Sequence, residues 1–142
     1  HTGFAVVADG KLIRSGTQVF TGHVGKRLSG FATWLRDMLI SELPDLLVYE
    51  RPHFRGYAAT LSGVGMIAVI NMIAYEAGIK TIDVHTATLK KFATGYGKAK
   101  KSQMTSAANV AADLNLKTKE NNDEADAIHL ALYGSTNFGR DV

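Results

Sequence analysis

The alternation of apolar and polar residues at the start of the chain predicts a β-hairpin. Phe4–Ala8 is an apolar run, Asp9-Gly10 is a strong two-residue turn signal, and Lys11–Phe20 reads as a second strand. The pattern therefore places two paired strands before any helix.

Two long helices and two short strands follow. Apolar residues recur at spacings of three and four from Lys26 to Glu42, which predicts a helix that Pro44 helps to end. Short apolar runs at Asp45–Glu50 and in "KTIDVH", residues 80–85, are typical of buried strands in sheets covered by helices. Ala58–Ala77 is apolar on nearly every side, so we expect this helix to face the sheet on one side and a second subunit on the other.

The remaining residues predict helices separated by polar loops. Thr86 opens a short helix, Ser102–Leu114 forms another, and Asn122 caps a last one. We expect a polar loop in "NLKTKENN", residues 115–122, and a loose tail from Gly134. A hairpin followed by alternating helices and strands predicts a mixed sheet with helices on both faces.

Composition agrees with a single globular domain, residues 1–142, and excludes thiol chemistry. Hydrophobic residues make up 46% of the chain, as in globular rather than disordered proteins. The absence of cysteine excludes disulfides, thiolate metal sites and cysteine nucleophiles. No signal peptide is visible, and polar residues and glycines interrupt the apolar run Tyr57–Tyr75, so we expect a cytoplasmic protein that does not span a membrane.

Basic residues gather in one segment of the chain. The formal charge is only +3, with a pI of about 9.2, but no Asp or Glu lies between Val84 and Ala112. Acidic residues concentrate at Asp37–Glu50 and Glu120–Asp126. A basic segment beside an acidic site suits a metal nuclease, in which lysines attract phosphates and carboxylates hold the ion. The alternative is a solvated lysine-rich loop. The lysines of the segment are Lys90, Lys91, Lys98, Lys100 and Lys101.

Three carboxylates are candidates for a metal site. Asp123 and Asp126 are three residues apart, so on a helix they share a face. Glu50 ends its predicted strand, where ligand sites in open α/β sheets gather. Together they would suit Mg²⁺ or Mn²⁺, and two such ions could hold the attacking and leaving oxygens of phosphodiester hydrolysis. The alternatives are a capped surface helix with an acidic first turn, and a Glu50 that pairs with Arg51 or Arg55.

Other chemistry finds less support in the sequence. "TGYGKAKKS" lacks the residues that a P-loop requires, because Phe92 and Ala99 occupy their positions, so we expect no nucleotide cofactor. Lys90 and Lys101, which flank this loop, could still touch phosphates. His129 lies one turn after the second aspartate, and it either approaches the ion or makes an ordinary helix-face hydrogen bond. The sequence contains no recognisable Ser-His-Asp catalytic triad.

Four stretches occur in the order known from one nuclease family: "HTGFAVV", "LLVYERPHFRGYAAT", "TLKKFATGYGKAKKSQM" and "NNDEADAIHLALY". In these stretches, which cover nearly the whole chain, the sequence resembles the RuvC-like Holliday junction resolvases of the RNase H-like superfamily, particularly small bacteriophage versions. The resemblance implies an α/β RNase H-like fold, with a mixed β-sheet flanked by helices. It also implies a homodimer and Mg²⁺-dependent cleavage of branched DNA in a bacterial or phage-infected cell.

The resemblance also implies roles for individual residues. Such enzymes use four acidic residues. Glu50 matches the strand-end glutamate of the family, and Asp123 and Asp126 match its carboxyl-terminal aspartate pair. Lys90 and Lys101 match positions where the family keeps lysines near the cut phosphate.

Two parts of the match are incomplete. His53 and Phe54 lie in the loop where the family places an aromatic wedge at the junction centre, but the match is off by one position. The first catalytic aspartate of the family lies on the first strand, a few residues before the Thr-Gly pair, whereas Thr2-Gly3 here follows only His1. We therefore expect the first strand and its aspartate to be truncated from the sequence as given, and a chain that truly lacks them to be inactive.

The leading hypothesis is a structure-selective endodeoxyribonuclease that resolves four-way junctions and other branched DNA by paired cuts. Glu50, Asp123 and Asp126 would bind two Mg²⁺ ions per site, which Mn²⁺ could replace, and Lys101 would act as a catalytic residue beside them. Helix 58–77 would form the dimer. The rivals are a non-catalytic DNA-junction-binding protein of the same fold and an assembly protein with no nucleic-acid role. The residues expected to bind DNA are Lys90, Lys91, Lys98, Lys100, Lys101, Arg55, His53 and Phe54.

Overall fold

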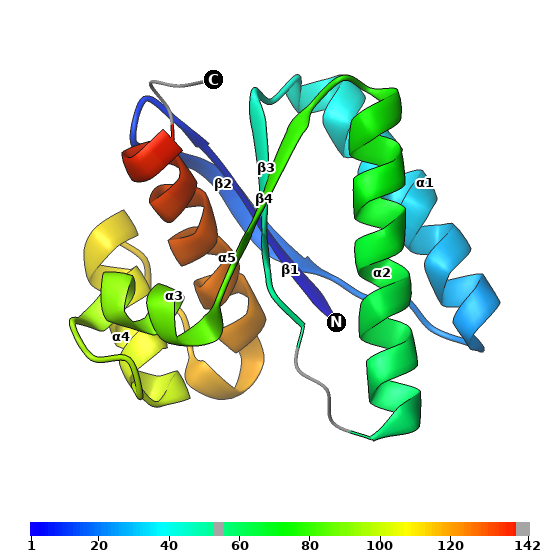
Figure 1. Ribbon diagram of the computed structural model, residues 1–142. Helices are drawn as coiled ribbons and strands as arrows, with labels where there is room; N and C mark the ends of the chain where they lie inside the picture. Colours follow the sequence, from blue (N-terminus) through cyan, green and yellow to red (C-terminus); the bar gives the residue numbers. More distant parts are fainter. Residues whose placement is uncertain (53–55, 139–142) are drawn as a thin grey trace.

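Two small sheets and the helices around them form the described part of the chain. The computed structural model describes residues 1–52 and 56–138 (Figure 1). One sheet is an antiparallel pair of strands and the other a parallel pair, and within these residues no ladder joins the two. The mixed sheet predicted from the sequence is therefore present in two parts.

The chain opens with a β-hairpin, as the sequence predicts. β1 (Thr2–Ala8) pairs antiparallel with β2 (Lys11–Gln18). Asp9 and Gly10 both adopt positive φ, 53° and 75°. Two consecutive residues in this region are typical of a type I′ turn, whose twist matches that of a hairpin.

The parallel sheet brings the end of one strand beside the start of a helix. β3 (Leu46–Glu50) and β4 (Lys80–Val84) are paired so that their last residues face each other. α2 (Tyr57–Glu76) connects them. Because parallel strands end at the same edge of a sheet, Glu50 lies next to α3 (Thr86–Thr94), which follows β4 directly. Both predicted strands are confirmed.

The first hydrophobic core lies between two long helices. α1 (Val24–Glu42) buries Phe31, Leu35 and Leu39 against Ile73 of α2. The spacing of four residues between the three α1 positions places them on one face of the helix. The predicted amphipathic helix is therefore confirmed.

The second core fixes two short helices to the parallel sheet. α4 (Lys101–Ala112) packs with α3 against β4, and Val84, Leu89 and Met104 are each at most 3% exposed, together with Ala99. Leu89 comes from α3 and Met104 from α4. This core therefore fixes the positions of both helices relative to the end of β4.

α5 (Thr118–Phe138) packs against strands of both sheets. A Cβ on Gly134 would lie 2.6 Å from Val48 Cγ2 of β3. On β1, a Cβ on Gly3 would collide with the backbone carbonyl of Asp123. The two glycines therefore permit the helix to approach both strands closely, and α5 holds together two sheets that share no ladder.

Two predictions about the end of the chain are wrong. Residues 118–120 are helical rather than a polar loop, and the helix breaks at Asn121, with φ −128° and ψ 18°, instead of beginning at a cap on Asn122. Residues 134–138 are not loose, because Gly134 is buried and α5 continues to Phe138. Packing against β3 stabilises this last part of the helix.

α2 packs on one side only. Its buried residues are Ile73 and Ala74, and its most apolar stretch, of mean hydropathy 1.6, is 11% buried. By length and composition it is the one described helix that could cross a membrane, a weak indication by itself. A Cβ on Gly65 would lie 3.2 Å from Leu28 Cδ1 of α1. This glycine therefore permits a close contact between α1 and α2.

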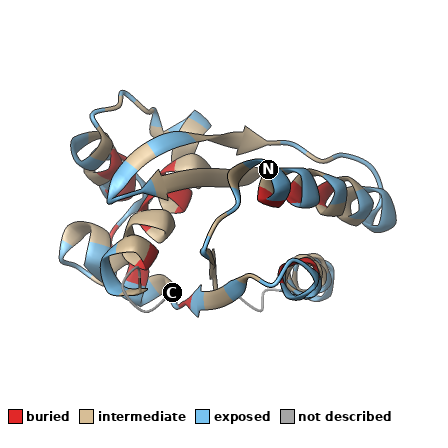
Figure 2. Cartoon of the chain, turned by 90° about the horizontal axis from the view of Figure 1, so that it is seen from above, coloured by how far each residue is buried: buried red, intermediate tan, exposed pale blue. Residues whose placement is uncertain are grey.

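Burial follows the inward sides of the helices (Figure 2). In Figure 1, α3, α4 and α5 lie on one side of the strands, and α1 and α2 lie on the other. β4 leads into α3 at the lower end of this view, where the orange first turns of α5 also lie. Elements far apart in the sequence thus meet at this end of the parallel sheet.

Candidate metal and nucleic-acid site

Glu50 is held at the end of β3 by a contact with α3. The Thr86 hydroxyl donates a hydrogen bond to Glu50 Oε1 over 2.6 Å. Arg51, which was an alternative partner for Glu50, instead places its Nε 2.9 Å from Asp83 Oδ2. The glutamate therefore faces the start of α3, and its neighbour Arg51 pairs with a residue of β4.

The aspartate pair lies just after the break in α5, where the helix is anchored on the hairpin. Gly3 of β1 lies directly against the backbone of Asp123. The Ser15 hydroxyl of β2 donates to Glu124 Oε2 over 2.6 Å. These contacts fix the turn of helix that carries Asp123 and Asp126 against the hairpin.

The charges of this region act on one carboxyl group. Burial, and after it the negative charges of Glu50 and Asp123, raise the pKa of Asp126 to about 6, although the positive charges of Lys90 and Lys101 act in the opposite direction. The five side chains come from β3, α3, α4 and α5. Glu50, which the sequence places more than seventy residues before Asp126, is therefore near enough to influence the ionisation of that carboxyl group.

The donor chemistry of the three carboxylates fits a hard divalent cation. Carboxylate oxygens are preferred ligands of Mg²⁺ and Mn²⁺. No three Asp, Glu or His groups in residues 1–52 and 56–138 are arranged as a closed ligand set.

The predicted lysines divide into two groups. Lys90 of α3 and Lys101, the first residue of α4, act on the Asp126 carboxyl. The start of α4 is fixed because the Lys100 backbone N–H donates to Gln103 Oε1 over 2.7 Å. Lys91, Lys98 and Lys100 are exposed, which leaves their charges available to a polyanion.

Comparison with known proteins decides the family. A family model described as crossover junction endodeoxyribonuclease RuvC matches residues 1–133. The chain belongs to the RuvC family. The RuvC protein of Carboxydothermus hydrogenoformans, named as a crossover junction endodeoxyribonuclease, is 32% identical over 136 residues, which cover 92% of this chain and 85% of that protein.

Solved RuvC structures share the fold. The structure of Thermus thermophilus RuvC matches with a TM-score of 0.78 at 17% identity, covering 98% of this chain and 89% of that one. The T. thermophilus RuvC in complex with a Holliday junction substrate matches with a TM-score of 0.76 at 16% identity, covering 95% and 93%. The α/β RNase H-like fold implied by the resemblance is therefore confirmed.

His129 has a structural position in this RuvC-family chain. It is 2% exposed, and its Nε2 lies 2.9 Å from the Met104 carbonyl oxygen. Since a carbonyl only accepts, Nε2 carries the proton and donates. Burial lowers the pKa of His129, and the hydrogen bond to Met104 partly opposes this. The ordinary hydrogen bond expected as one alternative is present, and it ties α5 to α4.

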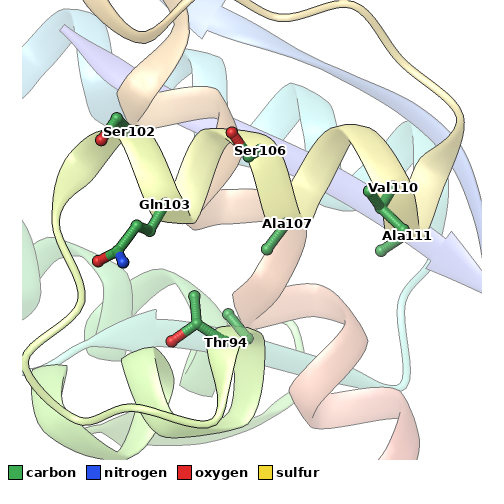
Figure 3. A pocket seen from close by; sticks show the side chains of 8 residues that line it. Thr94, Ser102, Gln103, Ser106, Ala107, Val110 and Ala111 are labelled. Carbon is green, nitrogen blue, oxygen red and sulfur yellow. The ribbon is translucent and has the colours of Figure 1, made fainter.

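An open groove lies beside α4 (Figure 3). It has a volume of about 590 Å³ and is open to solvent. Small and polar side chains line it, and none of the three carboxylates does. We place the candidate site of the RuvC fold at the carboxylates, where ionisable groups from four elements interact. The groove is lined by Ala93, Thr94, Ser102, Gln103, Ser106, Ala107, Val110 and Ala111.

Sequence reasoning missed Thr86 as a part of the site. It was identified only as the opening of a helix, and the cap is in fact His85, whose Nδ1 accepts from the Ala87 N–H over 3.2 Å. The sequence did contain a signal for this contact. Thr86 directly follows the strand that pairs with the Glu50 strand, and adjacent parallel strands end at the same edge of a sheet. His53, Phe54 and Arg55 lie outside the described residues.

Proposed function

We propose that this chain is a structure-selective endodeoxyribonuclease that resolves Holliday junctions and other branched DNA by paired hydrolytic cuts. Membership of the RuvC family supports the reaction. The observation that carries the proposal is the interaction of Glu50, Asp123, Lys90 and Lys101 with the Asp126 carboxyl. The protein would work in the cytoplasm of a bacterial or phage-infected cell, where such DNA is present.

Glu50, Asp123 and Asp126 would hold the metal. Their carboxylates suit two Mg²⁺ ions, with Mn²⁺ as a substitute. When bound, such ions supply an activated water and neutralise the charge that develops on the phosphate. The contribution of the chain is to keep three mutually repelling carboxylates in one place, with Thr86 bonded to Glu50 and the hairpin anchored to α5.

The lysines would hold the DNA. Lys90 and Lys101 lie at the carboxylates and would steady the phosphate to be cut, Lys101 as the catalytic residue of the pair. The exposed Lys91, Lys98 and Lys100 would contact neighbouring phosphates and make binding depend on salt. His53, Phe54 and Arg55 stay predictions for the junction centre.

The exposed face of α2 would form a homodimer. A row of apolar side chains runs along this face and is left uncovered by the rest of the described chain. Two copies related by a two-fold axis would cover both rows and present two sites to the two symmetric strands of a four-way junction. The row consists of Tyr57, Leu61, Val64, Met72 and Tyr75, each at least 45% exposed.

Exchange of Glu50 for glutamine tests the proposal. Glu50→Gln keeps the size of the side chain and removes its charge, so cleavage of a labelled four-way junction in Mg²⁺ is expected to fall below detection while junction binding is retained. The matched control is Glu120→Gln, an exposed glutamate at the start of α5, which should cut as the parent does. Undiminished cutting by Glu50→Gln would remove Glu50 from the mechanism.

A junction-binding protein without catalysis is the second candidate. The observation in its favour is that the described carboxylates do not form a closed ligand set. Calorimetry with Mn²⁺ separates the two functions, because a nuclease of this kind must bind the ion and a simple binder need not. Both functions require DNA affinity that weakens as salt rises, whereas an assembly protein would show none.

A further inference from the structure

Thr86 joins the start of α3 to the end of β3 through a hydrogen bond to the Glu50 carboxylate. Its Oγ1 lies 2.6 Å from Glu50 Oε1, in a partly buried setting, although 36 residues separate the two in the chain. A hydroxyl that donates to a carboxylate at this distance makes a charge-assisted hydrogen bond. Thr86 is also the first residue of α3, so the carboxylate lies at the helix end that favours negative charge.

The helix that presents Thr86 is firmly seated. Leu89 of α3 is 1% exposed in the second core, and His85 caps the first turn. Lys90 follows Thr86 by four residues, which places both on the same face of α3. One face of α3 therefore contacts Glu50 through Thr86 and also carries Lys90.

We propose that Thr86 is a positioning residue of the metal site, which holds the Glu50 carboxylate ready for a divalent cation. The inference rests on the proposed function. Three carboxylates repel one another before an ion arrives, so a glutamate without support would turn toward solvent. The Thr86 hydroxyl bonds one oxygen of Glu50 without adding charge. Hydrogen-bond partners of metal ligands act in this way, and their loss typically weakens metal binding about 10- to 100-fold.

Metal affinity measured without DNA tests the proposal directly. The parent protein, Thr86→Val, Thr86→Ser and Thr88→Val are titrated with Mn²⁺ by calorimetry. Thr86→Val keeps the shape of the side chain and loses the hydroxyl, so its affinity for Mn²⁺ is expected to fall about 10-fold or more. Thr86→Ser keeps the hydroxyl and should bind close to the parent value. Thr88→Val makes the same exchange at an exposed position of α3 and should change nothing.

A double-mutant cycle identifies the residue through which Thr86 acts. In the Glu50→Gln background, Thr86→Val should cause no further loss of Mn²⁺ affinity, because the charged metal ligand that the hydroxyl positions is already removed. Cleavage by Thr86→Val should recover in part as Mg²⁺ is raised, while junction binding without divalent ions stays at the parental level. A purely structural role would lower the melting temperature and junction binding together with metal affinity.

The other possible outcomes test the role of Thr86 separately from the proposed function. Parental Mn²⁺ affinity in Thr86→Val, in a parent that binds the ion and cuts junctions, overturns the role of Thr86 and leaves the proposed function standing. A parent that neither binds Mn²⁺ nor cuts overturns both. If Thr86→Val does not fold, Thr86→Ser and Thr86→Ala decide: the role of Thr86 is rejected unless serine retains the affinity that alanine loses.

Discussion

Folding favours the neutral form of the Asp126 carboxyl, whereas the proposed metal role requires its charged form. Its pKa is raised from 3.8 to about 6 by burial and by the charges of Glu50 and Asp123. In the unfolded chain the carboxyl keeps its ordinary pKa, so between these two values the folded state binds more protons. Stability without metal therefore falls as the pH rises from about 4 to 6, and the full cost is present above pH 6.

Asp126→Asn should remove this cost. Raising the pKa of Asp126 from 3.8 to about 6 corresponds to a cost of about 3 kcal/mol in the free energy of unfolding. Because the group is partly exposed, solvent screening reduces this cost to about 1–2 kcal/mol. The variant is expected to exceed the ion-free parent in free energy of unfolding by this amount at pH 7.5, and to equal it near pH 4. Denaturant unfolding in a chelator at both pH values measures the difference. Added Mg²⁺ should stabilise the parent alone, and a variant less stable than the parent at pH 7.5 would contradict the argument.

The packing of β1 against α5 depends on one glycine. A Cβ at Gly3 would collide with backbone atoms of Asp123, which cannot rotate away. Gly3→Ala is therefore expected to cost about 1–3 kcal/mol and to displace the turn that bears Asp123. Thermal unfolding and Mn²⁺ titration measure both effects. Gly97→Ala is the control, because its Cβ would meet Ala87 O at 3.6 Å, an ordinary contact.

The loop that leads into α4 should set the salt dependence of DNA binding. Lys98 and Lys100 are exposed there, in a segment without acidic residues. Each phosphate contact that is lost lowers the slope of log affinity against log salt by about one. Lys98→Gln combined with Lys100→Gln should therefore reduce the slope by about two. Lys11→Gln, an exposed lysine beside the hairpin turn, should leave it unchanged, and an unchanged slope in the double variant would place the DNA elsewhere.

Local patterns predicted most elements correctly because their causes are local. The Asp9-Gly10 turn, the helical spacing around Phe31 and the apolar run before Glu50 each depend on neighbouring residues. The errors concern α5, where a helix continues past Gly134 because it packs against Val48, a residue of a distant strand. No periodicity near Gly134 carries that information.

The convergence of the site is a property of the whole molecule, and the sequence predicted it only in part. Strand-end placement suggested Glu50, helical spacing paired Asp123 with Asp126, and the resemblance to a family supported their combination into one candidate metal site. Thr86 and Ser15 were missed because their hydroxyls contact residues 36 and 109 positions away. Such contacts depend on how α3 and the hairpin pack, which no local pattern specifies.

The proposed dimer determines how many strands of a four-way junction are cut. Leu61 is 48% exposed on α2, within the apolar row that we propose as the dimer contact. Leu61→Glu would bury a charge in that contact, so the variant is expected to sediment as a monomer and to nick one strand of a four-way junction instead of making paired cuts. Ile40→Glu, the same kind of exchange at a residue 73% exposed on α1, should remain dimeric. A parent that sediments as a monomer at every concentration tested would contradict the proposed dimer contact.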